Sequence, residues 1–305
     1  MRFLPPAEFV RSNAALTRNW TPEESLEYTR WLATTHYENF HVVSVLLPRR
    51  LHQDFYNVYS FCRWSDDLGD EIPDKEEALH LLGWWNELLE RMLAGEAWHP
   101  VYRALATTVE KHSLEPEPFR DLIRAFVHDQ TVSRYADWSE VHAYCRCSAN
   151  PVGRLVLALC GYRDEERRRL SDATCTALQL ANFWQDISVD LRKDRVYIPQ
   201  HLIERQGYSV AELFAGVEND AFRAVMRDAV EHARRLFYEG LPLVGMVDKR
   251  LAIDLDLFSR GGLRVLDRIT DMQFNVLHHR PVVSKVERVG LLLSSALRQL
   301  FRSAA

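Results

Sequence analysis

Hydrophobic residues along this chain recur mainly at spacings of three and four, the period that places side chains on one face of a helix. The pattern is clearest over residues 78–93, where the apolar positions are Leu81, Leu82, Trp85, Leu88 and Leu89. The preceding Asp74-Lys75-Glu76-Glu77 has the composition of a helix N-terminus. Thr21-Pro22-Glu23-Glu24 combines a capping box with proline at the first helical position, so we expect a helix from there toward His36.

The same spacing predicts further helices over residues 49–70, 99–111, 117–135, 139–160, 171–191, 220–242, 250–279 and 283–302. Strand-like alternation bounded by turn residues does not occur in the sequence. The 12 glycines and 12 prolines are spread along the chain without forming a linker, and no repeat is visible. We therefore predict a single all-α domain over residues 1–305.

The composition, with 47% apolar and 27% charged residues, is that of a soluble globular protein able to bury a core. A net charge of −5 gives no reason to expect nucleic acid as a partner. Five cysteines without disulfide spacing fit a reducing cytoplasm. Cys145-Arg146-Cys147 suggests a metal site, but no second Cys/His pair with zinc spacing accompanies it, which favours ordinary buried or helix-surface thiols.

The N-terminal residues lack the apolar core of a signal peptide, and no apolar stretch has the length of a membrane span, so we expect a cytoplasmic location. The most lipophilic stretch, residues 289–293, continues into serines and arginines and predicts an amphipathic C-terminal helix. This helix either packs on the protein's own core, which we favour, or lies on the inner membrane as a peripheral contact.

Two aspartate motifs carry the chemistry that the sequence suggests. The first aspartate motif is Asp66 and Asp70, and the second is Asn182, Asp186 and Asp190. Residues four apart on a helix share a face, with Cβ atoms about 5–6 Å apart. Mg²⁺ prefers oxygen ligands and usually takes one or two carboxylates plus water and substrate phosphates. Two such motifs facing each other across a cavity would hold a metal–diphosphate cluster.

Each motif extends into a longer polar stripe. Tyr59 and Arg63 precede Asp66 on the same predicted face, and a lone stripe of this kind is more often a solvated helix surface. Gln179 lies one turn before Asn182, in a segment rich in apolar residues that we expect to be buried on several sides. Because buried carboxylates need cations, the second motif favours metal ions.

A basic segment, Leu191-Arg192-Lys193-Asp194-Arg195-Val196-Tyr197, follows the second motif. Its charges either complement the C-terminal end of a helix dipole or bind diphosphate oxygens. We favour the phosphate role for Arg195 and leave Arg192 and Lys193 open between the two.

Competing chemistries lack their motifs. The sequence has no glycine-rich phosphate loop, since Gly261-Gly262 stands alone, and no nucleophile elbow or metalloprotease histidine spacing. His128 and His278-His279 are interpreted as ordinary surface or core histidines. Without a dinucleotide fingerprint, a nicotinamide cofactor is not supported.

The chain resembles the squalene/phytoene synthase family of head-to-head prenyl transferases from about His36 to about Ile269. The motifs that carry the resemblance are Asp-x-x-x-Asp after Tyr-x-x-x-Arg, and Asn-x-x-x-Asp-x-x-x-Asp before a basic segment with tyrosine. The resemblance implies an isoprenoid-synthase-type helical bundle with a central active-site cavity, Mg²⁺ as cofactor, and diphosphate contacts at Tyr59 and Arg63. It implies Mg²⁺ ligands at Asp66, Asp70, Asn182, Asp186 and Asp190.

We assign the catalytic role to the four aspartates of the two motifs with Tyr59 and Arg63. Further substrate contacts are predicted at His36, Asn39, Tyr144, Asn150, Gln179, Asn182, Arg195 and Tyr197.

Two segments depart from the condensing members of the family. His36-Tyr37-Glu38-Asn39-Phe40 replaces a serine-rich His-Ser-x-Ser-Phe, and residues 144–153 replace a Tyr-Cys segment followed by Val-Ala-Gly. Gly261-Gly262 aligns where a tyrosine is common. Asn39-Phe40 and Ser148-Ala149-Asn150-Pro151-Val152-Gly153-Arg154 resemble the bacterial hydroxysqualene synthase branch of hopanoid biosynthesis. This resemblance implies that presqualene diphosphate loses diphosphate and water captures the rearranged cation. Asn39 and Asn150 either position that water or cap helices.

Two alternatives stay open. A condensing synthase would join two prenyl diphosphates to give presqualene diphosphate, squalene, phytoene or dehydrosqualene, and the altered segment at His36 weighs against its second allylic site. A non-catalytic assembly factor of the same family is disfavoured, because all four outer aspartates and Asn182 are retained. The expected partners are a prenyl diphosphate substrate and other enzymes of its pathway.

Overall fold

The computed structural model describes residues 3–35, 48–284, 287 and 295, and this part of the chain is helical with one isolated bridge, between Arg134 and Val196, in place of any strand ladder. The described residues divide into two compact units. The first lies within Met1–Thr131 and Arg154–Arg163, and the second within Val132–Gly153 and Asp164–Ala305. The predicted all-α fold is confirmed, whereas its organisation as a single domain stays a prediction.

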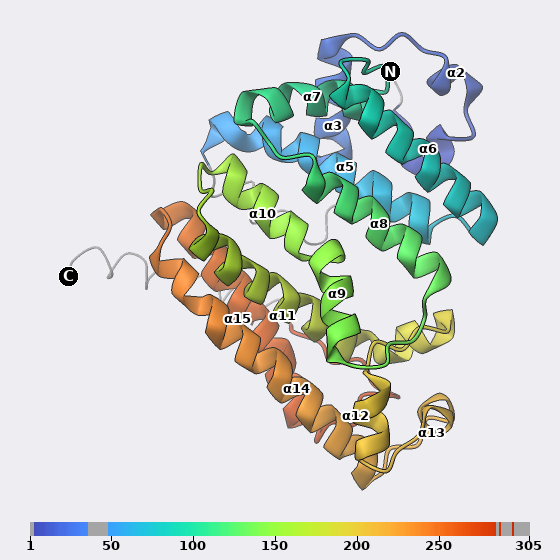
Figure 1. The fold of residues 1–305 in the computed structure, drawn as a ribbon, viewed down its shortest axis with the longest axis vertical. Coiled ribbons are helices and arrows are strands. Elements are labelled where there is room, and N and C mark those ends of the chain that lie inside the picture. Colours follow the sequence, from blue (N-terminus) through green and yellow to red (C-terminus); the bar gives the residue numbers. More distant parts are fainter. Residues whose placement is uncertain (1–2, 36–47, 285–286, 288–294, 296–305) are drawn as a thin grey trace. The chain divides into compact units, whose positions relative to one another are not determined.

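The first unit is built around α5 (His52–Asp70), which packs against α3, α6, α7 and α8 (Figure 1). The elements around it are α1 (Pro6–Phe9), α2 (Asn13–Leu16), α3 (Pro22–Thr35), η1 (Arg49–Leu51), α6 (Lys75–Leu93), α7 (Pro100–His112) and α8 (Glu117–Thr131). Helices α3 and α6 begin where the caps predict, with Thr21 bonded to Glu24 and Asp74 accepting from the backbone of Glu77.

Aromatic packing fixes one face of α5. Trp64 lies flat on Trp85, with ring centroids 4.9 Å apart, and both are fully buried. The Trp64 indole N–H donates to the Tyr28 hydroxyl at 3.1 Å, which ties α5 to α3. His99 lies edge-on to Trp64 and is fully buried, and burial lowers its pKa well below the usual range. This histidine is therefore a neutral core residue that caps α7 through Nδ1.

A buried polar layer sets the position of α5 along its neighbours. The Asn57 amide accepts from Thr29 Oγ1 at 2.7 Å on α3 and donates to the Ala104 carbonyl at 3.0 Å on α7. Asp54, one turn earlier, binds Lys111 Nζ at 2.7 Å. Since buried polar groups are costly when unpaired, these bonds favour one register of the three helices.

The second unit is built around α11 (Glu165–Asp190), which packs against α9, α14 and α15. The other elements are α9 (Trp138–Ser148), α10 (Asn150–Leu159, whose later residues belong to the first unit), η2 (Leu191–Lys193), α12 (Gln200–Arg205), α13 (Val210–Phe214), α14 (Asp220–Gly240), η3 (Leu241–Gly245) and α15 (Lys249–Asp271). Helix α15 approaches its neighbours closely at Gly262, where a Cβ would collide with Phe237 of α14 and lie 3.1 Å from Leu178 of α11.

Asp254 is an unusual residue in the interior of the second unit. It lies on α15 with 1% of its surface exposed, and neither carboxyl oxygen has a hydrogen-bond partner among the described residues. Burial, with Asp248 nearby, raises the pKa of Asp254 to about 8. The side chain is therefore mainly the neutral acid at pH 7, since an isolated buried carboxylate is strongly disfavoured.

Several predicted helix boundaries are wrong. The single helix expected over 139–160 is two, because Pro151 has no N–H with which to continue the α9 ladder. Helix α15 ends at Asp271 instead of 279, where Gln273 and Phe274 adopt positive φ angles of 53° and 63°. Helix α8 ends at Thr131 instead of 135. Helix α11 begins at Glu165, six residues early, behind the N-cap Asp164.

Other expectations have mixed outcomes. Short helices α1, α2, α12 and α13 were not predicted, since fewer than two turns show no periodicity. The helix expected over 283–302 lies largely outside the described residues. None of the five cysteines, all of them described residues, forms a disulfide, and all are at least partly buried, as expected for ordinary thiols. No described helix combines the length and the hydropathy required to cross a bilayer.

Candidate active site

The first aspartate motif lies on the accessible face of α5. Phe61, Trp64 and Leu68 bury the opposite side completely. Tyr59, Arg63 and Asp66 are half-buried and Asp70 is exposed, so the predicted polar stripe is present and reachable.

Arg63 is held by carboxylates of its own helix. Its guanidinium forms an ion pair with Asp67, which is only 4% exposed, and a second, longer contact with Asp66 at 3.5 Å. Asp67 was not singled out from the sequence, although its i,i+4 spacing from Arg63 is the signal that identifies the pair. Arg63 therefore partly neutralises the negative charge of Asp66 and Asp67 on its own helix.

The carboxyl groups of Asp66, Asp67 and Asp70 repel one another and would attract a cation. Desolvation raises the pKa of Asp66 to about 6, and the neighbouring Asp70 and Asp67 add to the rise while Arg63 opposes it. Desolvation likewise raises the pKa of Asp67 to about 6 against Arg63. Burial raises the pKa of Tyr59 as well. A divalent cation would relieve the repulsion among these acids.

The end of α5 is fixed by α8. The Gln130 side chain donates to the Gly69 carbonyl at 2.9 Å. A Cβ at Gly69 would lie 3.2 Å from the Phe126 ring, so the glycine inside the Asp-Asp-Leu-Gly-Asp sequence allows this close packing. Asp66 and Asp70 are thus presented from a rigid helix end.

The second aspartate motif lies on α11. Most of its apolar neighbours are buried as predicted, namely Leu180, Ala181, Phe183 and Trp184, whereas Leu178 is half-buried. The polar stripe itself is accessible, with Asn182 exposed and Gln179, Asp186 and Asp190 half-buried. The motif therefore lies on the border between a packed interior and solvent, as a ligand-binding stripe requires.

Asp186 is engaged by an arginine far along the chain. Arg280 forms a two-pronged ion pair with it, through Nε to Oδ1 and through a terminal nitrogen to Oδ2 at 3.2 Å. Arg280 was not predicted from the sequence, because 94 residues separate the partners and no local spacing links them.

The basic segment after the motif packs back onto α11. Tyr197 stacks on Phe183 with ring centroids 3.7 Å apart and nearly parallel planes, and Tyr144 lies 5.7 Å from Tyr197. The backbone N–H of Arg195 donates to the Asp190 carbonyl at 2.9 Å. Two predicted contact residues, Tyr144 and Tyr197, therefore meet in one aromatic cluster beside the second motif.

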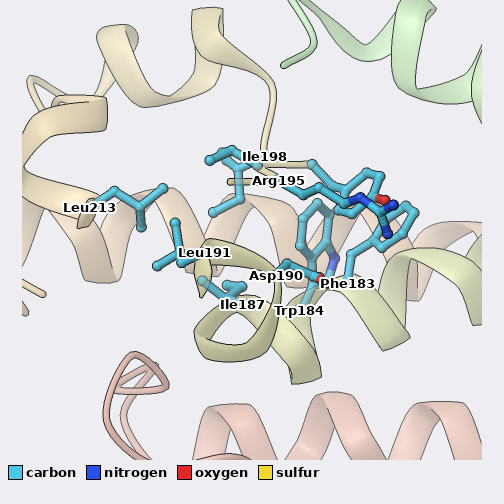
Figure 2. A pocket seen from close by; sticks show the side chains of 10 residues that line it. Phe183, Trp184, Ile187, Asp190, Leu191, Arg195, Ile198 and Leu213 are labelled. Atoms are coloured by element: carbon cyan, nitrogen blue, oxygen red, sulfur yellow. The ribbon is translucent and has the colours of Figure 1, made fainter. Parts of the chain in front are cut away.

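Figure 2 shows the small cavity that these elements enclose. Asp190 and Trp184 of α11 and Arg195 of the basic segment line it, with the apolar side chains of Ile187, Leu191, Ile198 and Leu213 and others. Its volume of about 10 Å³ admits about one water molecule and no prenyl chain. The cavity brings Arg195 together with Asp190, while Arg192 and Lys193 are exposed.

Asn150 is buried at the start of α10, and its amide oxygen accepts from Thr176 Oγ1 at 2.9 Å. This hydrogen bond gives Asn150 a structural role. Its role in positioning water stays a prediction. His36 and Asn39 lie outside the described residues.

The residues present fit Mg²⁺. Each motif offers carboxylates on an accessible helix face, and in both the oxygens attract a cation of the chain itself, Arg63 or Arg280. Within the described ranges, no three or more His, Cys, Asp or Glu side chains are arranged to hold a metal on their own. One or two carboxylates per ion, completed by water and substrate phosphates, is the usual Mg²⁺ arrangement.

Comparison with known proteins gives the chain its family. The squalene/phytoene synthase family profile matches residues 33–287. The chain belongs to the squalene/phytoene synthase family. It is 31% identical to the hydroxysqualene synthase of Rhodopseudomonas palustris, over 87% of this chain and 91% of that protein. It is 29% identical to the 15-cis-phytoene synthase of Synechococcus elongatus, over 76% and 77% of the two chains.

Among solved structures, the squalene synthase HpnC from Alicyclobacillus acidocaldarius is 44% identical, with a TM-score of 0.80 over 83% of this chain and 96% of that one. A dehydrosqualene synthase in complex with ligand, 21% identical, shares the fold with a TM-score of 0.82. The family and fold predicted from the sequence are confirmed, and the chain is a squalene/phytoene synthase family enzyme.

Proposed function

We propose that this enzyme ionises presqualene diphosphate with the help of Mg²⁺ and lets water capture the resulting cation, which gives hydroxysqualene and diphosphate. The observation that carries the proposal is the retention of both aspartate motifs on accessible helix faces, in a chain 31% identical to two hydroxysqualene synthases. The altered segments at 36–40 and 144–153 support the same choice.

Asp66 and Asp70 on α5, and Asp186 and Asp190 with Asn182 on α11, would be the Mg²⁺ ligands. Bound there, Mg²⁺ would act as a Lewis acid that stabilises charge on the departing diphosphate. Arg195 and Tyr59 would donate hydrogen bonds to the diphosphate oxygens. Arg63 would keep the carboxylates of Asp66 and Asp67 oriented.

The proposed step balances without a redox partner. The carbon–oxygen bond to diphosphate breaks, the bond to a water oxygen forms, and one water proton is lost to solvent. Formation of squalene would instead require a hydride donor, and the sequence lacks a dinucleotide fingerprint. Because substrate and product are lipophilic, we also propose peripheral membrane contact in the cytoplasm.

The test is incubation of the full chain with Mg²⁺ and either presqualene diphosphate or farnesyl diphosphate, in ¹⁸O-labelled water, with products identified by mass spectrometry. We expect consumption of presqualene diphosphate and one ¹⁸O atom in the alcohol product. A chelator control should stop the reaction. Consumption of farnesyl diphosphate alone would contradict the proposal.

The second candidate is condensation of two prenyl diphosphates. It is favoured by the relatives named phytoene synthase and by the structure named squalene synthase. Formation of presqualene diphosphate or dehydrosqualene from farnesyl diphosphate in the same assay, or of phytoene from geranylgeranyl diphosphate added in its place, would establish it.

A further inference from the structure

Asp186 is a predicted Mg²⁺ ligand whose two carboxylate oxygens both contact an arginine from a distant part of the chain. Arg280 occupies Oδ1 and Oδ2 together. Mg²⁺ binds carboxylate oxygens at 2.0–2.1 Å in a strict octahedral geometry. A guanidinium and a divalent cation compete for these oxygens, because their like charges repel at contact distance.

The segment that carries Arg280 is attached to α11 at this point. The Gln185 side chain, adjacent to Asp186, donates to the Pro281 carbonyl at 2.6 Å. The Arg280 and Asp186 side chains are 53% and 30% exposed. An ion pair this exposed is weak, so an incoming metal can displace it at little cost.

Contacts on both sides of this segment hold it near α11 when the Arg280–Asp186 ion pair is broken. Before it, the Leu277 N–H donates to Glu218 at 2.8 Å and His278 Nε2 donates to the Gly216 carbonyl at 2.9 Å. After it, Glu287 accepts from the Ser284 N–H at 2.9 Å and pairs with Arg264 at 2.7 Å. Residues 279–283 lie between these anchors.

We propose that Arg280 is an internal counter-ion of Asp186 that stands where the metal would bind, and that Mg²⁺ exchanges with it. The exchange removes the Arg280 contact with α11 and leaves residues 279–283 held there by the Gln185–Pro281 hydrogen bond, so the segment loosens while its flanks stay anchored. Metal occupancy of the second motif is thereby coupled to the position of a segment 94 residues away in sequence. The inference rests on the proposed function, in that Asp186 is taken as a metal ligand.

The experiment is a calorimetric titration of the full chain with Mg²⁺ alone, without diphosphate. It is made in an Asp66→Asn, Asp70→Asn background, so that the second motif reports by itself. We expect Arg280→Gln to bind Mg²⁺ about threefold to tenfold more tightly, because the competing cation is gone. Arg205→Gln is the matched control, since Arg205 forms an exposed pair with Asp228 on another helix of the same unit. It should leave the affinity unchanged.

Hydrogen exchange supplies a second readout that does not depend on activity. Mg²⁺ should speed exchange of the backbone amides of His279, Arg280, Val282 and Val283 in the parent chain. In Arg280→Gln the same amides should exchange fast with or without Mg²⁺. Equal or weaker Mg²⁺ binding by Arg280→Gln would overturn the inference and leave the proposed function standing. Absence of Mg²⁺ binding in every variant would overturn the metal role of the second motif and the inference together.

Discussion

The two aspartate motifs are alike in spacing and exposure, and they differ in where their counter-charge comes from. On α5, Arg63 lies one turn before the acids and pairs with Asp67 and Asp66 on the same helix. On α11, the cation for Asp186 is Arg280, from a segment beyond α15. The first motif is thus neutralised as soon as its helix forms, whereas the second is neutralised only when distant parts of its unit have folded.

This difference makes Arg63 a permanent counter-charge of its motif and Arg280 an exchangeable one. The Asp67 carboxylate is 4% exposed and Arg63 cannot leave it without stranding a buried charge. The Asp186 carboxylate is half-buried and tolerates a change of partner. We expect Mg²⁺ binding to change the contacts of the second motif more than those of the first. We expect the ion pair of the first motif to contribute more to the free energy of unfolding.

The largest expected effect is on catalysis, where the two motifs should be equivalent. Asp66→Asn and Asp186→Asn should each lower kcat by at least about 100-fold, because each removes a charged Mg²⁺ ligand. Product formation from presqualene diphosphate at saturating Mg²⁺ measures this. Asp194→Asn, a change of an exposed acid just past the second motif, is the control. Retained activity in either motif variant would break the equivalence.

Asp254, whose buried carboxyl has no hydrogen-bond partner among the described residues, adds a third case to the two motifs. The folded-state pKa of Asp254 is about 8, above the usual value of about 3.9. The folded chain therefore binds the proton more tightly, and this group lowers stability progressively as pH rises from about 4 to 8. Asp254→Asn should be more stable than the parent at pH 8 by about 2–4 kcal/mol, and the gain should shrink toward pH 5. Urea unfolding at both pH values measures it. A gain independent of pH would show that Asp254 is ionised in the fold.

The stability of the two arginine variants tests the distinction directly. Arg63→Ala should lower the free energy of unfolding by about 1–3 kcal/mol, since Asp67 is left buried without its cation. Arg280→Ala should change it by less than about 0.5 kcal/mol, as for other exposed pairs. Urea unfolding at pH 7.5 compares the two. Equal losses would mean that burial of Asp67 does not matter.

The smallest expected effect concerns pH and metal together. Because the pKa of Asp66 is about 6, protons should compete with Mg²⁺ at the first motif below that pH. The Mg²⁺ concentration for half-maximal activity should rise about threefold between pH 7 and pH 5.5. Asp67→Asn should move this rise to lower pH, since the Asp67 charge helps to hold the Asp66 pKa up. A profile unchanged by that substitution would assign the titration to another group.

Local sequence patterns predicted what depends on neighbours along the chain. The polar stripe of α5, the caps of α3 and α6, and the apolar side of α11 all follow from residues within about two turns. The break at Pro151 was missed because apolar periodicity continues through it, although proline alone was sufficient warning. The pairing of Asp186 with Arg280 could not be predicted from the sequence, since it depends on how α11 and the segment after α15 come together in three dimensions.

The tight fit around Gly262 has a consequence for how this enzyme can diverge. A larger residue there would occupy the space of Phe237 and press on Leu178, each on a different helix. Relatives that carry a bulky side chain at this point need smaller partners at the other two positions. We therefore expect a larger residue at position 262 to occur together with changes at positions 237 and 178 during evolution.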